Sequence, residues 1–265
     1  MSLLACTLLI ANFAVPCAPQ GSEARLSELV AAVRSADYRG DRAALDRLDV
    51  ALGKLPDSAL DEYRSYWRGF ARWRRALNGF NETPMPADLA SDVEAALGHF
   101  RAALERRPGW IEARLAMAGC WGNLIYLAGD DAAKRQAILA EAVPVGRTLQ
   151  PDAPDNPRVL WIIGGIQLSA PPPTGGDPVK AAATLRHGVE CSWREARAEA
   201  APAWVPAWGG AENLMMLAYV YSRTALKNKE AALAYARGAL VAVPEWHYVR
   251  DVLLPQIEAM PDPAK

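Results

Sequence analysis

The sequence has few of the residues on which most enzyme active sites depend. Its 265 residues include three histidines and four cysteines. No histidine lies in an H-E-x-x-H motif or beside a Ser or Cys nucleophile, and no glycine-rich phosphate loop is present. We therefore predict no catalytic residues, no cofactor and no metal site. An enzyme with an unrecognised site remains the alternative.

The sequence also lacks an excess of charge of either sign. Lys and Arg number 29 and Asp and Glu number 30, which gives a net charge of −1 and a pI near 6.3. A nucleic-acid-binding surface needs clustered positive charge to displace counterions from phosphates. The composition therefore argues against a nucleic-acid partner.

The apolar run at residues 3–15, LLACTLLIANFAV, is too short for a membrane span, which needs about 20 residues. A segment with Pro, Gly and Ser follows it, as is typical of a signal peptide. We predict a signal peptide at residues 1–24 and a single domain at 25–265, in a protein that is exported to the periplasm and does not span the membrane. A docked N-terminal helix is the alternative. Lipid attachment at Cys17 is less favoured, because residues 14–16 make a poor lipobox.

Removal of that segment leaves two cysteines, too few for a disulfide framework. Cys120 and Cys191 lie in apolar helical patterns, where a free cysteine packs as a small core residue, and one bridge between them is left open. Cys191 is four residues from both His187 and Glu195, so these three share a helix face and could supply metal ligands. No companion cluster is visible, and we interpret them as packing residues.

What the sequence does have is a repeated spacing of small residues. Two small residues seven apart lie on one helix face, where a second helix can approach, and a proline five residues later ends the helix. Such a repeat predicts a solenoid, in which helical hairpins bury their apolar faces by stacking. The copies are Ala96–Phe100–Ala103–Pro108, Ala44–Leu48–Ala51–Pro56, Ala232–Ala236–Ala239–Pro244 and, without the proline, Ala181–Leu185–Gly188.

This spacing resembles the second helix of the tetratricopeptide repeat (TPR). We therefore predict an all-α, TPR-like solenoid of about five helical hairpins, with a C-terminal capping helix from Glu245 to Met260. Among exported members, the chain looks most similar to the periplasmic TPR component of TRAP-type transporters, whose helices surround a ligand pore. The resemblance implies a non-enzymatic scaffold that binds a protein or peptide partner, or an apolar small ligand, on a concave face lined by first helices. A purely structural assembly module is a further alternative.

The resemblance also suggests which side chains line that face. In the family, the position five residues after the small contact residue of a first helix faces the concave side. Asn123 and Arg223 hold this position after Ala118 and Ala218. With the aromatic residues of the expected first helices and loops, the predicted binding residues are Trp73, Trp121, Asn123, Trp161, Trp208 and Arg223.

Two other segments have more than one interpretation. In the helix predicted to begin at Ser58, aromatic side chains fall on one face and four arginines, Arg64, Arg68, Arg72 and Arg75, on another. We interpret the aromatics as core and the arginines as solvent-exposed, with an anion site or membrane-surface strip as the alternative. The proline-rich segment 169–178 is interpreted as a rigid connector, with a reach into the groove as the alternative.

Overall fold

The computed structural model describes residues 21–56, 59–198 and 201–261, and within these ranges its regular elements are all helical. The predicted all-α class is therefore confirmed for the described part of the chain. Most of the predicted signal peptide lies outside these ranges. Its last three residues belong to the first helix, α1 (Ser22–Tyr38). None of the described helices combines the length and the apolar character needed to cross a bilayer.

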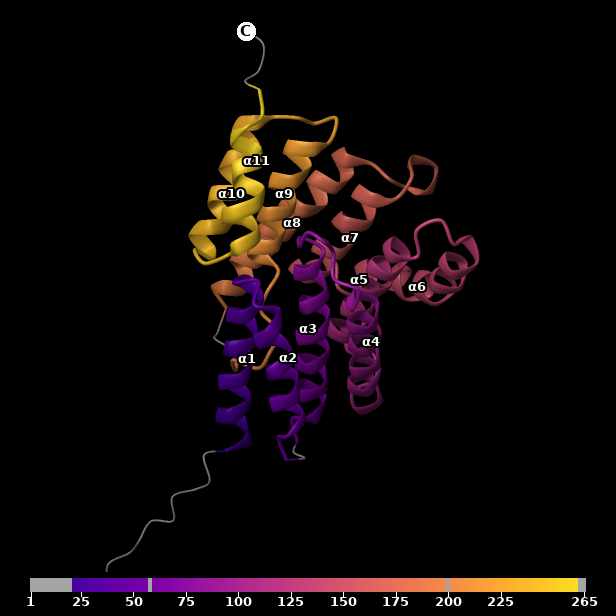
Figure 1. Cartoon of the computed structure of the whole chain (residues 1–265), viewed down its shortest axis with the longest axis vertical. Helices are drawn as coiled ribbons and strands as arrows, with labels where there is room; N and C mark the ends of the chain where they lie inside the picture. Colours follow the sequence, from indigo (N-terminus) through magenta and orange to yellow (C-terminus); the bar gives the residue numbers. More distant parts are fainter. Residues whose placement is uncertain (1–20, 57–58, 199–200, 262–265) are drawn as a thin grey trace, which may run out of the picture.

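In the part of the chain that the structure describes, ten helices form five consecutive pairs, which confirms the predicted solenoid of hairpins (Figure 1). A π-helical segment, η2 (Tyr248–Leu253), and a short helix, α11 (Leu254–Glu258), form the C-terminal cap. The remaining elements of the pairs are α2 (Arg42–Gly53), α3 (Asp61–Gly79), α4 (Leu89–Arg106), α5 (Ile111–Leu127), α6 (Ala132–Asp152), α7 (Pro157–Ser169), α8 (Pro178–Ala196), α9 (Gly210–Arg223) and α10 (Lys229–Ala242).

The helix boundaries follow from capping side chains and prolines. Asp41, Asn156 and Asp177 each accept hydrogen bonds from backbone N–H groups in the first turn of the helix that follows, which satisfies donors that the helix itself leaves free. The helix start predicted at Ser58 lies outside the described residues, and α3 begins at Asp61. Pro144 does not end its helix, because α6 continues to Asp152.

The small-residue pattern marks the buried contacts between paired helices. Ala96, Phe100 and Ala103 are fully buried, and Phe100 packs onto Gly69 of α3, where a Cβ atom would lie 2.8 Å from the ring. The copies in α8 and α10 are buried as well. In α2 the predicted residues Ala44, Leu48 and Ala51 are half-buried and pack against the core, whereas the fully buried apolar side chains are Leu45 and Leu52, each one residue further along the helix.

The aromatic face of α3 forms the centre of the core, as predicted. Trp73 and its aromatic neighbours in α3 are buried, and the segment between α8 and α9 packs against them. The indole N–H of Trp208 donates to the hydroxyl of Tyr66 at 2.9 Å, and that of Trp67 donates to the carbonyl of Trp204 at 2.7 Å. The two tryptophans of this proline-rich segment therefore belong to the core, rather than to an exposed ligand site.

Three of the four arginines on α3 face carboxylates of the flanking helices, and Arg64 pairs with Asp61 and donates to the carbonyl of Leu55. The prediction that the four arginines are solvent-exposed is therefore wrong. Arg68 and Arg72 donate to the two oxygens of Asp49 at 2.7 and 2.6 Å. Arg75 pairs with Asp92 of α4. Because α2 and α4 lie on either side of α3 and supply these carboxylates, the cationic strip is neutralised within the fold.

The array curls back on itself, so that its first and last units touch. The ring of Tyr38, at the end of α1, lies 5.1 Å from that of Trp246. The hydroxyl of Tyr38 donates to Glu212 of α9 at 2.8 Å. In Figure 1 the indigo α1 accordingly lies beneath the yellow C-terminal helices. This closure gives the solenoid an inner side that several first helices face together.

Candidate functional site

A continuous groove runs along the inner side of the array. It consists of two adjoining depressions, of about 380 and 350 Å³. Every α-helix that lines it is the first of its pair, as the TPR resemblance implies for a concave face. The residues common to both depressions are Phe80, Trp161, Gly165, Ser169 and Met216.

Glycines keep the floor of this groove open. Gly122 of α5 and Gly165 of α7 both line it, and an added Cβ atom at either would meet no other atom within 4 Å. Around them lie apolar and flexible side chains, among them Tyr126, Ile166 and Met216. A groove of this kind suits an apolar ligand, because methionine adapts to irregular shapes and the aromatic rings offer large apolar area. The sequence analysis did not single out these glycines.

Two of the six predicted binding residues, Asn123 and Trp161, line the groove. Trp73 and Trp208 do not, because they are buried behind Trp161, with ring centroids 5.9 and 5.5 Å from it. These four side chains therefore lie close together, but only Asn123 and Trp161 line the groove.

The other two predicted residues lie away from the groove. Trp121 packs in a separate depression between α4, α5 and α6. This depression lies between two hairpins. Trp121, a bulky residue three positions after a small contact residue, fills the space there. Arg223 stacks over the ring of Tyr219, which does line the groove, and it also bonds Gln256. Arg223 therefore supports the groove wall from behind.

Two residues that line the groove each have a polar atom that is not committed to the fold. The side-chain oxygen of Asn123 accepts a hydrogen bond from Trp73 at 2.9 Å, whereas its Nδ2 has no partner among the described residues. The indole N–H of Trp161 is buried and also lacks one within the described ranges. Because an unpaired buried donor costs about 1–3 kcal/mol, an acceptor on a ligand at this place would be favoured.

The charged groups at the end of the groove are paired with one another. Arg74 lies 2.7 Å from Asp37 and 4.0 Å from Glu212. Burial raises the pKa of Asp37, although the neighbouring Arg74 guanidinium opposes this shift. The cluster joins α1, α3 and α9, and its mutual pairing leaves the groove with little charge to offer a ligand.

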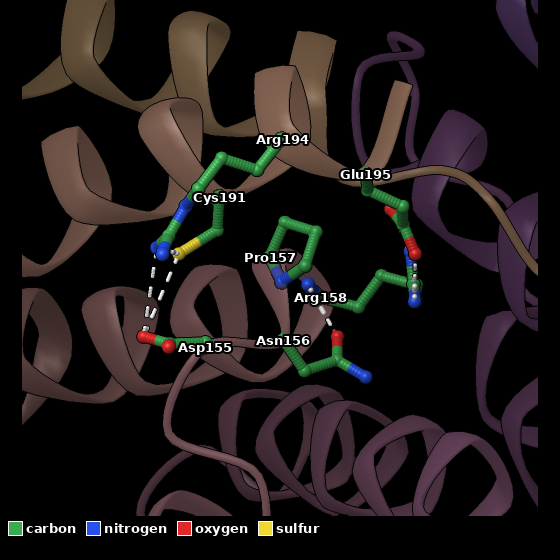
Figure 2. Close-up of a pocket in the computed structure, with 7 residues that line it drawn as sticks. All are labelled: Asp155, Asn156, Pro157, Arg158, Cys191, Arg194 and Glu195. Carbon is green, nitrogen blue, oxygen red and sulfur yellow. Dashed lines mark hydrogen bonds and ion pairs between the residues drawn. The ribbon is translucent and has the colours of Figure 1, made fainter. Parts of the chain in front are cut away.

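A second, smaller cleft of about 270 Å³ lies between the start of α7 and the end of α8 (Figure 2). Its inner part is an ion-pair cluster. Arg158 is buried and donates to Glu112 at 2.9 Å, to Glu195 at 2.9 and 2.8 Å and to the carbonyl of Trp208 at 3.0 Å. These bonds tie α5, α7, α8 and the segment before α9 together, and we assign this part of the cleft a structural role.

The outer part of the cleft brings Asp155 to His187 and Cys191. The Nε2 of His187 lies 2.8 Å from an oxygen of Asp155 and 3.6 Å from the sulfur of Cys191. Glu195, the third member expected from sequence, is instead held by Arg158. The sequence analysis missed Asp155 as a partner because it precedes a different helix.

This trio does not have the geometry of a nucleophilic triad. In such a triad the thiol and the carboxylate contact opposite nitrogens of the imidazole, whereas Cys191 and Asp155 both lie nearest to Nε2 of His187. Burial also raises the pKa of the Cys191 thiol, although Arg194 opposes this shift, and a raised pKa lowers the thiolate fraction that attack requires. Cys120 is a second free thiol, so the bridge left open by the sequence does not form.

The helix pairs, the buried small residues and the groove on the inner helices define a TPR-like helical repeat protein. No protein-family profile matches the chain, and no curated protein matches it. Among solved structures it is similar to a thermophilic TPR protein of Thermus thermophilus, at 17% sequence identity and a TM-score of 0.46, over 82% of this chain and 99% of that one. What the groove can bind follows from the residues that line it.

Proposed function

We propose that the chain is a non-enzymatic scaffold that binds an uncharged, apolar segment of a partner polypeptide in the inner groove. The observation that carries this proposal is the continuous groove between α5, α7 and α9, with open backbone at Gly122 and Gly165 and uncommitted hydrogen-bond donors at Asn123 and Trp161. Apolar side chains would fill the space over the glycines, and carbonyl groups of the bound segment would accept from the two donors.

A polypeptide fits these features better than a compact small molecule. The two depressions share five lining residues and so adjoin one another, which gives room for a longer ligand than either depression would hold alone. The internal pairing of Asp37 with Arg74 gives a charged ligand no counterpart. Backbone amides that recur along an extended segment, by contrast, can use donors spaced along the groove wall.

The first test is site-specific photo-crosslinking in the native host. A benzoylphenylalanine in place of Tyr126 lies at the groove without filling it, because this side chain is already aromatic, 66% exposed and part of the groove lining. The control position is Gly98, a helical glycine with open space around it that does not belong to the groove lining. We expect a polypeptide adduct at 126 and none at 98, and mass spectrometry of the adduct identifies the bound segment.

The second test titrates that segment, as a synthetic peptide, against purified protein. Gly122→Phe fills the groove and should weaken binding at least about tenfold, the equivalent of about 1.4 kcal/mol, whereas Gly98→Phe should bind like the wild type. Equal affinities for the two variants would refute the groove as the site. An adduct with a small molecule and no polypeptide would refute the proposed partner class and support the apolar-ligand alternative.

Export to the periplasm is part of the proposal, on the strength of residues 3–15 alone. Cell fractionation with an antibody to the C-terminal end tests it. Recovery in the periplasmic fraction, together with a mature protein that lacks the apolar run, is the expected result. Cytoplasmic recovery of the full-length chain would contradict it and would leave the groove proposal intact.

A further inference from the structure

Three side chains of different chemistry converge at the outer end of the second cleft. An oxygen of Asp155, Nε2 of His187 and the sulfur of Cys191 all lie within 4.8 Å of one another. His187 and Cys191 are one turn apart on α8, and so share a face. Asp155 directly precedes Asn156, whose side chain caps α7 through hydrogen bonds to two backbone N–H groups. The fold therefore sets the position of each of these three side chains.

The distances between the oxygen, nitrogen and sulfur atoms of the three side chains are close to those between the ligand atoms of a tetrahedral zinc site. With Zn–N near 2.0 Å, Zn–O near 2.1 Å and Zn–S near 2.3 Å, tetrahedral angles place nitrogen and oxygen each about 3.5 Å from sulfur. The sulfur of Cys191 lies 3.6 Å from Nε2 of His187 and 3.8 Å from Oδ1 of Asp155. The nitrogen-to-oxygen distance of 2.8 Å is a direct hydrogen bond, which an inserted ion would replace.

Two of these atoms, the sulfur of Cys191 and Oδ1 of Asp155, already face a positive charge. A guanidinium nitrogen of Arg194 lies 2.9 Å from the sulfur of Cys191 and 3.7 Å from Oδ1 of Asp155. Figure 2 shows Arg194 reaching back along α8 to this point. Its side chain is 58% exposed, so it can turn into solvent without loss of core packing. Arg194 thus holds the place that a metal cation would take.

We propose that Asp155, His187 and Cys191 form a zinc-binding site whose fourth position is open to water and for which Arg194 is a competing cation. The mixture of one thiolate, one imidazole and one carboxylate suits Zn²⁺ rather than Mg²⁺ or Ca²⁺, which prefer oxygen ligands alone. A bound ion would join the loop before α7 to α8, and thereby lock the fourth hairpin. The site is separate from the groove and does not rest on its proposed function.

The experiment uses purified full-length protein, with Co²⁺ as a spectroscopic probe and Zn²⁺ in competition with a chromophoric chelator. We expect one ion per chain, the intense visible absorption of tetrahedral Co²⁺ and a thiolate-to-cobalt charge-transfer band. Cys191→Ser should abolish that band. Asp155→Asn and His187→Gln should each weaken Zn²⁺ binding at least about tenfold, because even the loss of outer-shell partners costs 10–100-fold. Arg194→Ala should tighten binding.

A matched control comes from the other exposed histidine–carboxylate pair, His247 with Asp251, whose Nδ1 and Oδ2 atoms are 2.7 Å apart. His247→Gln should leave Zn²⁺ binding unchanged. Absence of the charge-transfer band from wild-type protein would overturn the proposal, as would an equal loss of affinity in His247→Gln. Asp155 and His187 are solvent-accessible, so circular dichroism of their variants should show the wild-type helix content, and weakened binding then reports on the site itself.

Discussion

Alanine at two glycines of α5, three residues apart, should change stability in opposite directions. Gly119 lies against the core, where an added Cβ atom would be 3.0 Å from Cη2 of Trp73 and from Cδ1 of Ile162, and closer still to Cζ2 of that indole. Gly122 faces the groove, and an added Cβ atom there meets nothing within 4 Å. Comparison of the two alanine variants therefore separates the cost of overpacking from the gain in helix propensity within one helix.

The size of the stability change in Gly119→Ala depends on how firmly Trp73 is held. Its ring is 1% exposed, packs against Phe100, Trp161 and Trp208, and donates its N–H to Asn123. Because the ring cannot move aside, overpacking at Gly119 should cost about 2–3 kcal/mol, in the upper part of the usual range. The better helix propensity of alanine returns about 1 kcal/mol. The net loss for Gly119→Ala is about 1–2 kcal/mol, whereas Gly122→Ala should gain about 0.5–1 kcal/mol.

Differential scanning calorimetry and urea denaturation measure both effects. For a chain of this size, each kcal/mol shifts the melting temperature by about 2–4 °C, so Gly119→Ala should melt several degrees below the wild type and Gly122→Ala slightly above it. If the two variants shift Tm in the same direction, Trp73 is not clamped as described. In that case the position of Asn123 in the groove, which Trp73 fixes through a hydrogen bond, is also in doubt.

Three further predictions concern stability. Ala103→Trp should overpack the contact between α3 and α4 and cost about 1–3 kcal/mol, and an unchanged Tm would show that Ala103 is not buried there. Arg158→Met leaves Glu112 buried without its ion-pair partner and should cost about 3–5 kcal/mol in urea denaturation, whereas the exposed Arg25→Met control should change little. Burial and neighbouring arginines lower the pKa of His99 from 6.5. The folded state therefore favours the neutral form of His99. The resulting contribution to the free energy of unfolding is fully present above pH 6.5, and it is lost as the pH falls toward the lowered pKa that His99 has in the folded state. Melting curves of His99→Gln should accordingly fall less steeply below pH 6.5 than those of the wild type, and parallel curves would contradict this.

The candidate sites show where local pattern stops being informative. Asn123 and Trp161 line the groove, but the TPR family position that Asn123 holds does not decide this by itself, because Arg223 holds the same position in α9 and lies away from the groove. Trp208 could not be placed correctly, because the irregular segment that carries it has no periodicity and finds its partners only in α3. Asp155 joins His187 and Cys191 across the α7–α8 interface, which no spacing within one helix reveals.

The sequence by itself determined the helices and their order. Caps such as Asp41 and Asn156, the prolines after helix ends and the small residues seven apart act within one or two turns, so their effects can be read locally. Only the tertiary structure decided which charges pair and which aromatics face a ligand. The arginines of α3 meet Asp49 and Asp92, and the array closes through Tyr38 and Trp246. Contacts of this kind depend on how the hairpins curve, and that curvature is a property of the whole packed array.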